Sequence, residues 1–161
     1  MFHLQRIGLL GDVHCQCQLL DVIVSFLNSR HLLILCTGDI VDGAGDPNKC
    51  IELLQSNNIL TVLGNHDRWL LDNEMRSLPD TTDFTELTTN SVEFLNSLPI
   101  TLEFSTPSGI ALLCHGLGEN NMAKLGPDIM VMALSSIWIF RGYRDKIILS
   151  LSSMVTPIEE W

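Results

Sequence analysis

Three apolar runs in the first half of the chain each end in glycine followed by an acidic or amide side chain. They are RIGLLGD (6–12), HLLILCTGD (31–39) and ILTVLGNHD (59–67). Runs of this length, bounded by glycine, are typical of strands buried on both faces of a sheet. Two segments with apolar residues at helical spacing separate them, marked by Leu19, Leu20, Ile23, Phe26 and Leu27 and by Cys50, Ile51, Leu53 and Leu54. Strands that alternate with helices predict parallel pairing through right-handed crossovers, so the three carboxyl ends should share one sheet edge.

Asp46 and Pro47 predict the start of the second helix as its cap and first residue. Further along, RWLLDNEM predicts a short helix, TTDFTEL a polar loop, and SVEFLNSLP a helix closed by Pro99. Residues 100–116 predict a hairpin with a turn at 106–109, whose second strand ends in His115. The loop TTDFTELTTN carries no motif that indicates a substrate.

The composition limits the classes of protein to which the chain can belong. Its 161 residues predict a single domain over 1–161, and 46% hydrophobic against 17% charged residues predict a packed core. The apolar runs are shorter than the roughly 18–20 residues that span a bilayer, and the N-terminus does not resemble a signal peptide, so we expect a cytoplasmic protein without a membrane partner. A net charge of −10 argues against bulk nucleic acid, and an acidic chain that acts on phosphates would need cations.

The five cysteines are odd in number and have no paired spacing. They are Cys15, Cys17, Cys36, Cys50 and Cys114. We interpret them as buried reduced thiols in preference to a metal or redox site.

Metal-type side chains gather at the predicted strand ends. They are Asp12 and His14 in GDVH, Asp39 in GDIVD, Asn65 and His66 in GNHD, and His115 in CHG. A single Gly-Asp after a strand is also an ordinary turn or helix cap, and His3 and His31 are interpreted as terminal and loop residues. Four such strand ends together favour a site, and their mixed oxygen and nitrogen donors suit Mn, Fe, Zn or Ni.

In this order the four motifs resemble the calcineurin-like metallophosphoesterase family, whose pattern is GDxH, GDxxD, GNH[DE], HG and GHxH. The match spans residues 11–116, and its spacing further resembles a small bacterial phosphodiesterase branch that includes diadenosine-tetraphosphatase-like proteins. The resemblance implies an α/β fold, a four-layer α/β/β/α sandwich, with two divalent metal ions at its edge.

The resemblance also implies a role for each residue. Asp12 and His14 would ligate one metal, Asp39 would bridge both, and Asn65 and His115 would ligate the second. His66 would act as the acid at the leaving group, oriented by Asp67, and Asp42 would support the centre from outside the ligand shell. A hydroxide shared by the metals would attack a phosphomonoester or phosphodiester, so the expected partner is a small phosphate ester or nucleotide.

The final GHxH motif is missing, because the chain has no histidine after His115. Residues 1–127 are therefore family-like, whereas 128–161 form an atypical tail that is truncated or aberrant. Two functions follow: a metal-dependent phosphoesterase, or a catalytically weak or inactive relative that serves as a phosphate-binding or interaction module.

A frame shift would explain the tail. MVTPIEEW (154–161) can be encoded as ATG GTC ACA CCC ATC GAA GAA TGG, which two bases later reads glycine, histidine, threonine, histidine. The codons permit this reading, which would restore the missing motif, and we expect residues from about Asp128 onward to be out of frame.

Overall fold

A three-stranded parallel sheet forms the centre of the fold. The computed structural model describes residues 7–30, 32–106, 109–122, 138–143 and 146–150, so His3 and His31 lie outside the described residues. The strands are β1 (Ile7–Leu10), β2 (Leu33–Cys36) and β3 (Leu60–Thr61), in the order β1-β2-β3. Their register confirms the predicted parallel pairing. β3 is shorter than its apolar run, because the N–H of Leu63 leaves the ladder and donates to the carbonyl of Pro99 at 2.8 Å.

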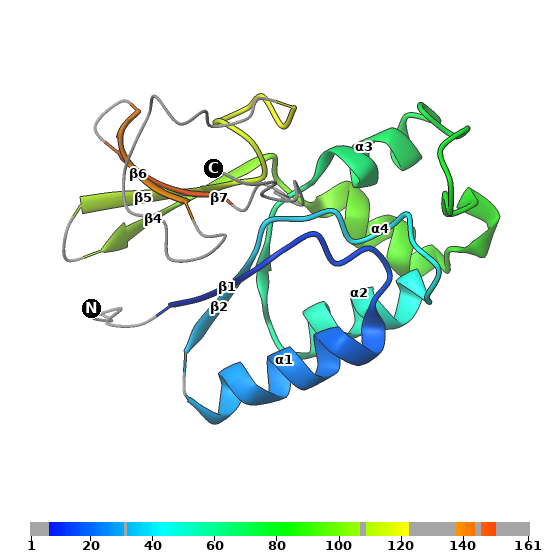
Figure 1. The fold of residues 1–161 in the computed structure, drawn as a ribbon, viewed down its shortest axis with the longest axis horizontal. Helices are drawn as coiled ribbons and strands as arrows, with labels where there is room; N and C mark the ends of the chain where they lie inside the picture. Colours follow the sequence, from blue (N-terminus) through cyan, green and yellow to red (C-terminus); the bar gives the residue numbers. More distant parts are fainter. Residues whose placement is uncertain (1–6, 31, 107–108, 123–137, 144–145, 151–161) are drawn as a thin grey trace, which may run out of the picture.

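Helices cover one face of this sheet (Figure 1). They are α1 (Cys17–Ser29), α2 (Pro47–Ser56) and α4 (Thr89–Ser97), and α1 and α2 lie side by side. The predicted cap of α2 is confirmed, since the Asp46 carboxylate accepts the backbone N–H groups of Asn48 and Lys49. These helices and the sheet share one apolar core.

A second sheet packs on the other face. It contains β4 (Thr101–Thr106), β5 (Gly109–Cys114), β6 (Trp138–Tyr143) and β7 (Lys146–Ser150), in the order β4-β5-β7-β6. β4 and β5 form the predicted antiparallel hairpin, although turn residues 107–108 lie outside the described residues. Leu35 and Val62 of the first sheet meet Ala111 and Leu113 of the second in a common apolar cluster. The mixed α/β fold is thus confirmed, and the described residues build three of the four layers that the resemblance implies.

A short helix, α3 (Asn65–Leu71), begins inside the GNHD motif, earlier than the RWLLDNEM pattern predicts. Gly64 caps this helix, and the Asp67 side chain returns to accept the Gly64 N–H at 3.0 Å. A 3-10 turn, η1 (Phe84–Glu86), follows in the predicted polar loop. Asn65 and His66 therefore stand in the first turn of a helix.

The apolar residues of α1 do not all face the core. Leu20 and Val24 are buried, whereas Leu19 and Phe26 are 57% and 54% exposed. α1 is apolar around most of its circumference, so spacing alone does not identify the side that faces the sheet. No helix in the part of the chain described here is long and apolar enough to cross a bilayer.

All five cysteines are free thiols, and four of them are buried. Burial raises the pKa of Cys36 and of Cys50 to about 12. These thiols stay protonated near neutral pH, as expected of reduced core cysteines. Of the predicted atypical tail, β6 and β7 are described, whereas residues 128–137, 144–145 and 151–161 lie outside the described residues.

Candidate metal centre

Backbone hydrogen bonds join the loops that follow β1 and β2. The N–H of Asp12 donates to the carbonyl of Gly38 at 3.1 Å, and the N–H of His14 donates to that of Asp39 at 2.9 Å. Gly64 brings the third loop against them, because a side-chain carbon at this position would overlap the Asp39 carboxylate and its backbone N. The structure therefore places the GDVH, GDIVD and GNHD segments at one sheet edge.

Five side-chain-bearing residues of these loops have left-handed backbone conformations. The φ angles are 50° at Asp12, 41° at His14, 58° at Cys15, 51° at Asp39 and 62° at Asp42. Side-chain-bearing residues rarely adopt this region, and such strain gathers at functional sites. The loop geometry is thus set by the surrounding contacts and not by the intrinsic preference of each residue.

The donor atoms form two clusters that share Asp39. One contains His14, Asp39 and His66, the other Asp12, Asp39 and His115, and within each cluster the ligand-type atoms lie within 4.8 Å of one another. This division differs from the predicted one, in which Asp12 and His14 share a metal. Both versions place the buried Asp39 carboxylate between two groups of donors.

The hydrogen bonds of two histidines leave their second nitrogens facing oxygen atoms. Nδ1 of His115 lies 2.8 Å from the Thr37 carbonyl, which can only accept, so Nδ1 carries the proton and donates it. Nε2 of His115 lies 2.9 Å from Oδ1 of Asn65 and 3.3 Å from Oδ2 of Asp39. An imidazole nitrogen, an amide oxygen and a carboxylate oxygen thus converge, and all three are atom types that ligate divalent metals.

His14 repeats the arrangement on the other side of Asp39. Its Nδ1 lies 2.8 Å from the carbonyl of Asp42 and 3.1 Å from that of Val41, so Nδ1 is again the donor. Nε2 lies 4.0 Å from Oδ2 of Asp39. Carbonyl partners that fix the far nitrogen are typical of metal-binding histidines, so these residues fit divalent ions.

The carboxylates of the centre repel one another. Burial, followed by the charge of Asp39, raises the pKa of Asp12. Burial and the same charge raise the pKa of Asp67 to about 6. A bound divalent cation would reverse this effect, because it stabilises the ionised carboxylates around it.

The structure does not place the Asp67 carboxylate against His66, which the sequence led us to expect it to orient. The Asp67 carboxylate is fully buried and accepts the N–H groups of Ile40, Val41 and Gly64 at 2.8, 3.2 and 3.0 Å. It therefore fastens the second loop to the start of α3. Nδ1 of His66 instead lies 2.9 Å from Oδ2 of Asp42, the residue expected to act only from outside the ligand shell.

Three residues around His66 were not among the predicted site residues. The Trp69 ring lies edge-on to the His66 ring with centroids 4.8 Å apart, on the helix that carries both. Arg76 forms an ion pair with Asp42 at 3.0 Å, and the Thr82 N–H donates to the same carboxylate at 2.9 Å. Only Trp69 carried a signal, its helical spacing from His66.

Comparisons with known proteins identify the family of the chain. The family model for calcineurin-like phosphoesterases matches residues 5–148. An uncharacterized protein of Methanocaldococcus jannaschii is 30% identical over 117 residues, covering 68% of this chain and 48% of that protein. The crystal structure of a metallophosphoesterase from Sphaerobacter thermophilus superposes with a TM-score of 0.52 at 25% identity, covering 70% of this chain and 46% of the other.

The chain belongs to the calcineurin-like phosphoesterase family. Its family suggests metal-dependent hydrolysis of phosphoesters, and the two donor clusters provide groups that can hold divalent metal. The chain spans about half the length of the two relatives described above.

Proposed function

We propose that the chain is a metal-dependent phosphoesterase that hydrolyses a small phosphate ester or nucleotide in the cytoplasm, with two divalent ions (Mn, Fe, Zn or Ni) in its centre. The observation that supports this most is the position of Asp39. Its carboxylate belongs to both donor clusters and is only 5% exposed. A buried carboxylate between two histidine nitrogens suits a bridging ligand.

Each residue of the centre has a distinct role in this proposal. The ions would be held by Asp12, His14, Asp39, Asn65 and His115. Bound ions would supply Lewis acidity that activates water and neutralises phosphate charge. Asp67 holds the loops in place through its backbone hydrogen bonds. Asp42 holds Nδ1 of His66, which leaves Nε2 for the substrate.

The reaction adds water across one phosphorus–oxygen bond. The water oxygen bonds to phosphorus as the bond to the leaving oxygen breaks, and the electron pair remains on that oxygen. His66 donates a proton from Nε2 to the leaving oxygen, and a proton from the attacking water passes to solvent. An imidazole beside a carboxylate suits this acid role near neutral pH.

Hydrolysis of bis(4-nitrophenyl) phosphate and 4-nitrophenyl phosphate, with manganese added or chelated, tests the proposal. We expect metal-dependent turnover that Asp39→Asn abolishes and that Asp21→Asn, a change at an exposed carboxylate of α1, leaves unchanged. Absence of turnover at every metal level, in a protein whose circular dichroism shows correct folding, would reject hydrolysis. Metal and phosphate binding without turnover would then support a binding module.

A further inference from the structure

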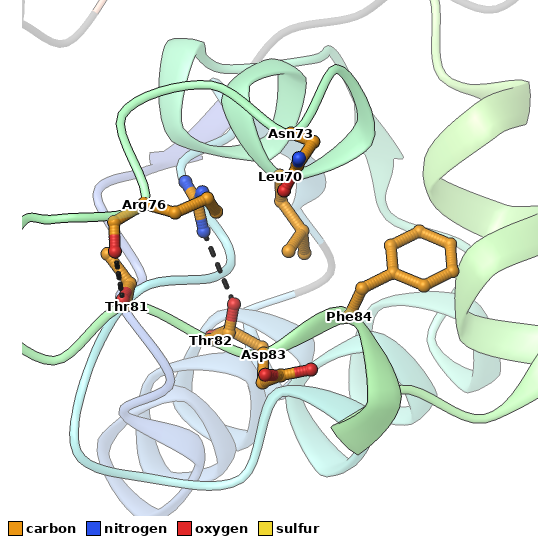
Figure 2. A pocket seen from close by; sticks show the side chains of 7 residues that line it. All are labelled: Leu70, Asn73, Arg76, Thr81, Thr82, Asp83 and Phe84. Atoms are coloured by element: carbon orange, nitrogen blue, oxygen red, sulfur yellow. Dashed lines mark hydrogen bonds between the residues drawn. The ribbon is translucent and has the colours of Figure 1, made fainter.

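Arg76 binds Asp42, the residue that holds Nδ1 of His66. It lies in the chain between α3 and η1, and its guanidinium contacts both oxygens of Asp42, Nη1 to Oδ1 and Nη2 to Oδ2, each at 3.0 Å. Nη1 also donates to the carbonyl of Thr82 at 3.2 Å, and Nε donates to the carbonyl of Glu74. Figure 2 shows Arg76 extending along the wall of a cavity toward Thr82. Paired donors in this geometry fix the plane of a carboxylate as well as its position.

The Asp42 carboxylate is almost fully engaged by these contacts. Oδ1 accepts from Arg76 and from the Thr82 N–H, while Oδ2 contacts Arg76 and Nδ1 of His66. The Asp42 N–H donates in return to the Thr82 hydroxyl at 3.0 Å. These four contacts hold the Asp42 carboxylate in one orientation.

We propose that Arg76 is a positioning residue for His66, which acts by fixing the Asp42 carboxylate that holds the His66 ring. The inference rests on the proposed function, in which Nε2 of His66 protonates the leaving oxygen. Arg76 itself contacts neither the substrate nor the donor clusters in this assignment. Thr82, in the polar loop TTDFTELTTN, contributes to the same role because it also hydrogen-bonds Asp42. We call the contacts of Arg76 and Thr82 with Asp42 the clamp.

Leaving groups of different basicity separate this role from a structural one. In Arg76→Ala we expect kcat to fall by about 10²-fold for a phenyl phosphodiester, the scale of a misplaced catalytic group, and far less for the 4-nitrophenyl diester, whose leaving group needs little protonation. KM should change little for either ester. An Arg30→Ala variant, which alters an exposed arginine at the end of α1, should lose neither activity. Equal losses on both esters would indicate a reduced folded fraction and would overturn the proposal.

The cavity beside Arg76 allows chemical rescue. It has a volume of about 220 Å³ and is lined by Leu70, Asn73, Arg76, Thr81, Thr82, Asp83 and Phe84 (Figure 2). Millimolar guanidinium should enter the space left in Arg76→Ala and restore turnover of the phenyl ester, whereas urea at the same concentration should not. Arg76→Lys keeps the charge without the paired contacts, so its loss should be intermediate. Failure of guanidinium to restore either the activity or the ring proton described next would count against the clamp.

An NMR measurement on metal-free protein tests whether Arg76 positions His66 and does not depend on hydrolytic activity. The Nδ1 proton of His66, bonded to buried Asp42, should give a slowly exchanging resonance in the wild type and in Arg30→Ala. The resonance should disappear in Arg76→Ala, because water then reaches Asp42, and return with guanidinium. An unchanged resonance in Arg76→Ala would overturn the proposal. If the wild type hydrolyses no ester, the proposed function fails while this experiment still decides the role of Arg76.

Discussion

At the scale of single residues, the centre depends on side chains that bind backbone as well as on those that could bind metal. Asp67 contributes no donor atom to either cluster, yet it joins two loops through three backbone N–H groups. Carbonyls of Thr37 and Asp42 fix the ring nitrogens of His115 and His14. The positions of the ligand side chains are therefore set by hydrogen bonds to groups that do not themselves bind metal.

The proposed roles of His66 and Asp39 predict opposite effects on metal content. His66→Ala should keep metal content nearly intact and reduce turnover by about 10²- to 10⁴-fold, the range for lost acid–base catalysis. Asp39→Ala should lose both ions, since its carboxylate belongs to both clusters. Elemental analysis of the purified variants, together with their kcat values, measures both effects. Equal metal loss in the two variants would make His66 a ligand, as its place in one cluster allows.

A side chain at position 64 should disturb the Asp39 carboxylate sterically. In Gly64→Ala the new methyl group would overlap the Asp39 side chain and backbone, so the loop must shift. We expect a loss of about 1–3 kcal/mol in the free energy of unfolding, typical of overpacking, together with weaker metal binding. Gly8→Ala is the matched control, because its methyl group would meet only the flexible end of Leu27. Denaturant unfolding and metal titration measure both, and equal effects in the two variants would contradict the explanation.

At the scale of elements, glycine, proline and capping residues made most of the fold predictable. The parallel strands, α2 with its Asp46 cap, and the β4–β5 hairpin follow from local signals. The outward side of α1 and the Arg76–Asp42 pair do not, because they depend on which surfaces meet after folding. Arg76 and Asp42 lie 34 residues apart, and neither position carries a pattern that indicates the other.

Removing the Asp46 cap of α2 should lower the free energy of unfolding without changing metal binding. Asp46→Ala removes the acceptor for the N–H groups of Asn48 and Lys49, which should reduce the free energy of unfolding by about 1 kcal/mol. Because Asp46 belongs to neither donor cluster, metal content should not change. Thermal unfolding of Asp46→Ala beside Asp21→Ala, an exposed position inside α1, measures the difference. A cap that contributes nothing would leave the two variants equally stable.

At the scale of the whole molecule, the sequence proposal about the last residues leads to a genetic test. The bases beneath residues 154–161 should encode glycine, histidine, threonine and histidine when read two positions later. If they do, restoring the frame should supply further histidine ligands, raise metal occupancy and increase phosphodiesterase activity. Other codons at these positions would reject the frame shift, and a restored chain with no gain in metal or activity would show that the tail does not limit the centre.

The donors of the centre come from distant parts of the chain, from Asp12 to His115, so an unfolded chain cannot gather them. Metal should therefore bind the folded state alone and stabilise it by mass action, by about 2.7 kcal/mol when the free ion is at 100 times its Kd. The melting temperature should then rise with manganese concentration and fall with a chelator, in wild type but not in Asp39→Ala. A wild-type melting temperature that does not change with manganese concentration would contradict this linkage between metal binding and folding. Where it holds, the supply of metal governs the lifetime of the folded chain, and starvation for the ion would expose it to proteolysis.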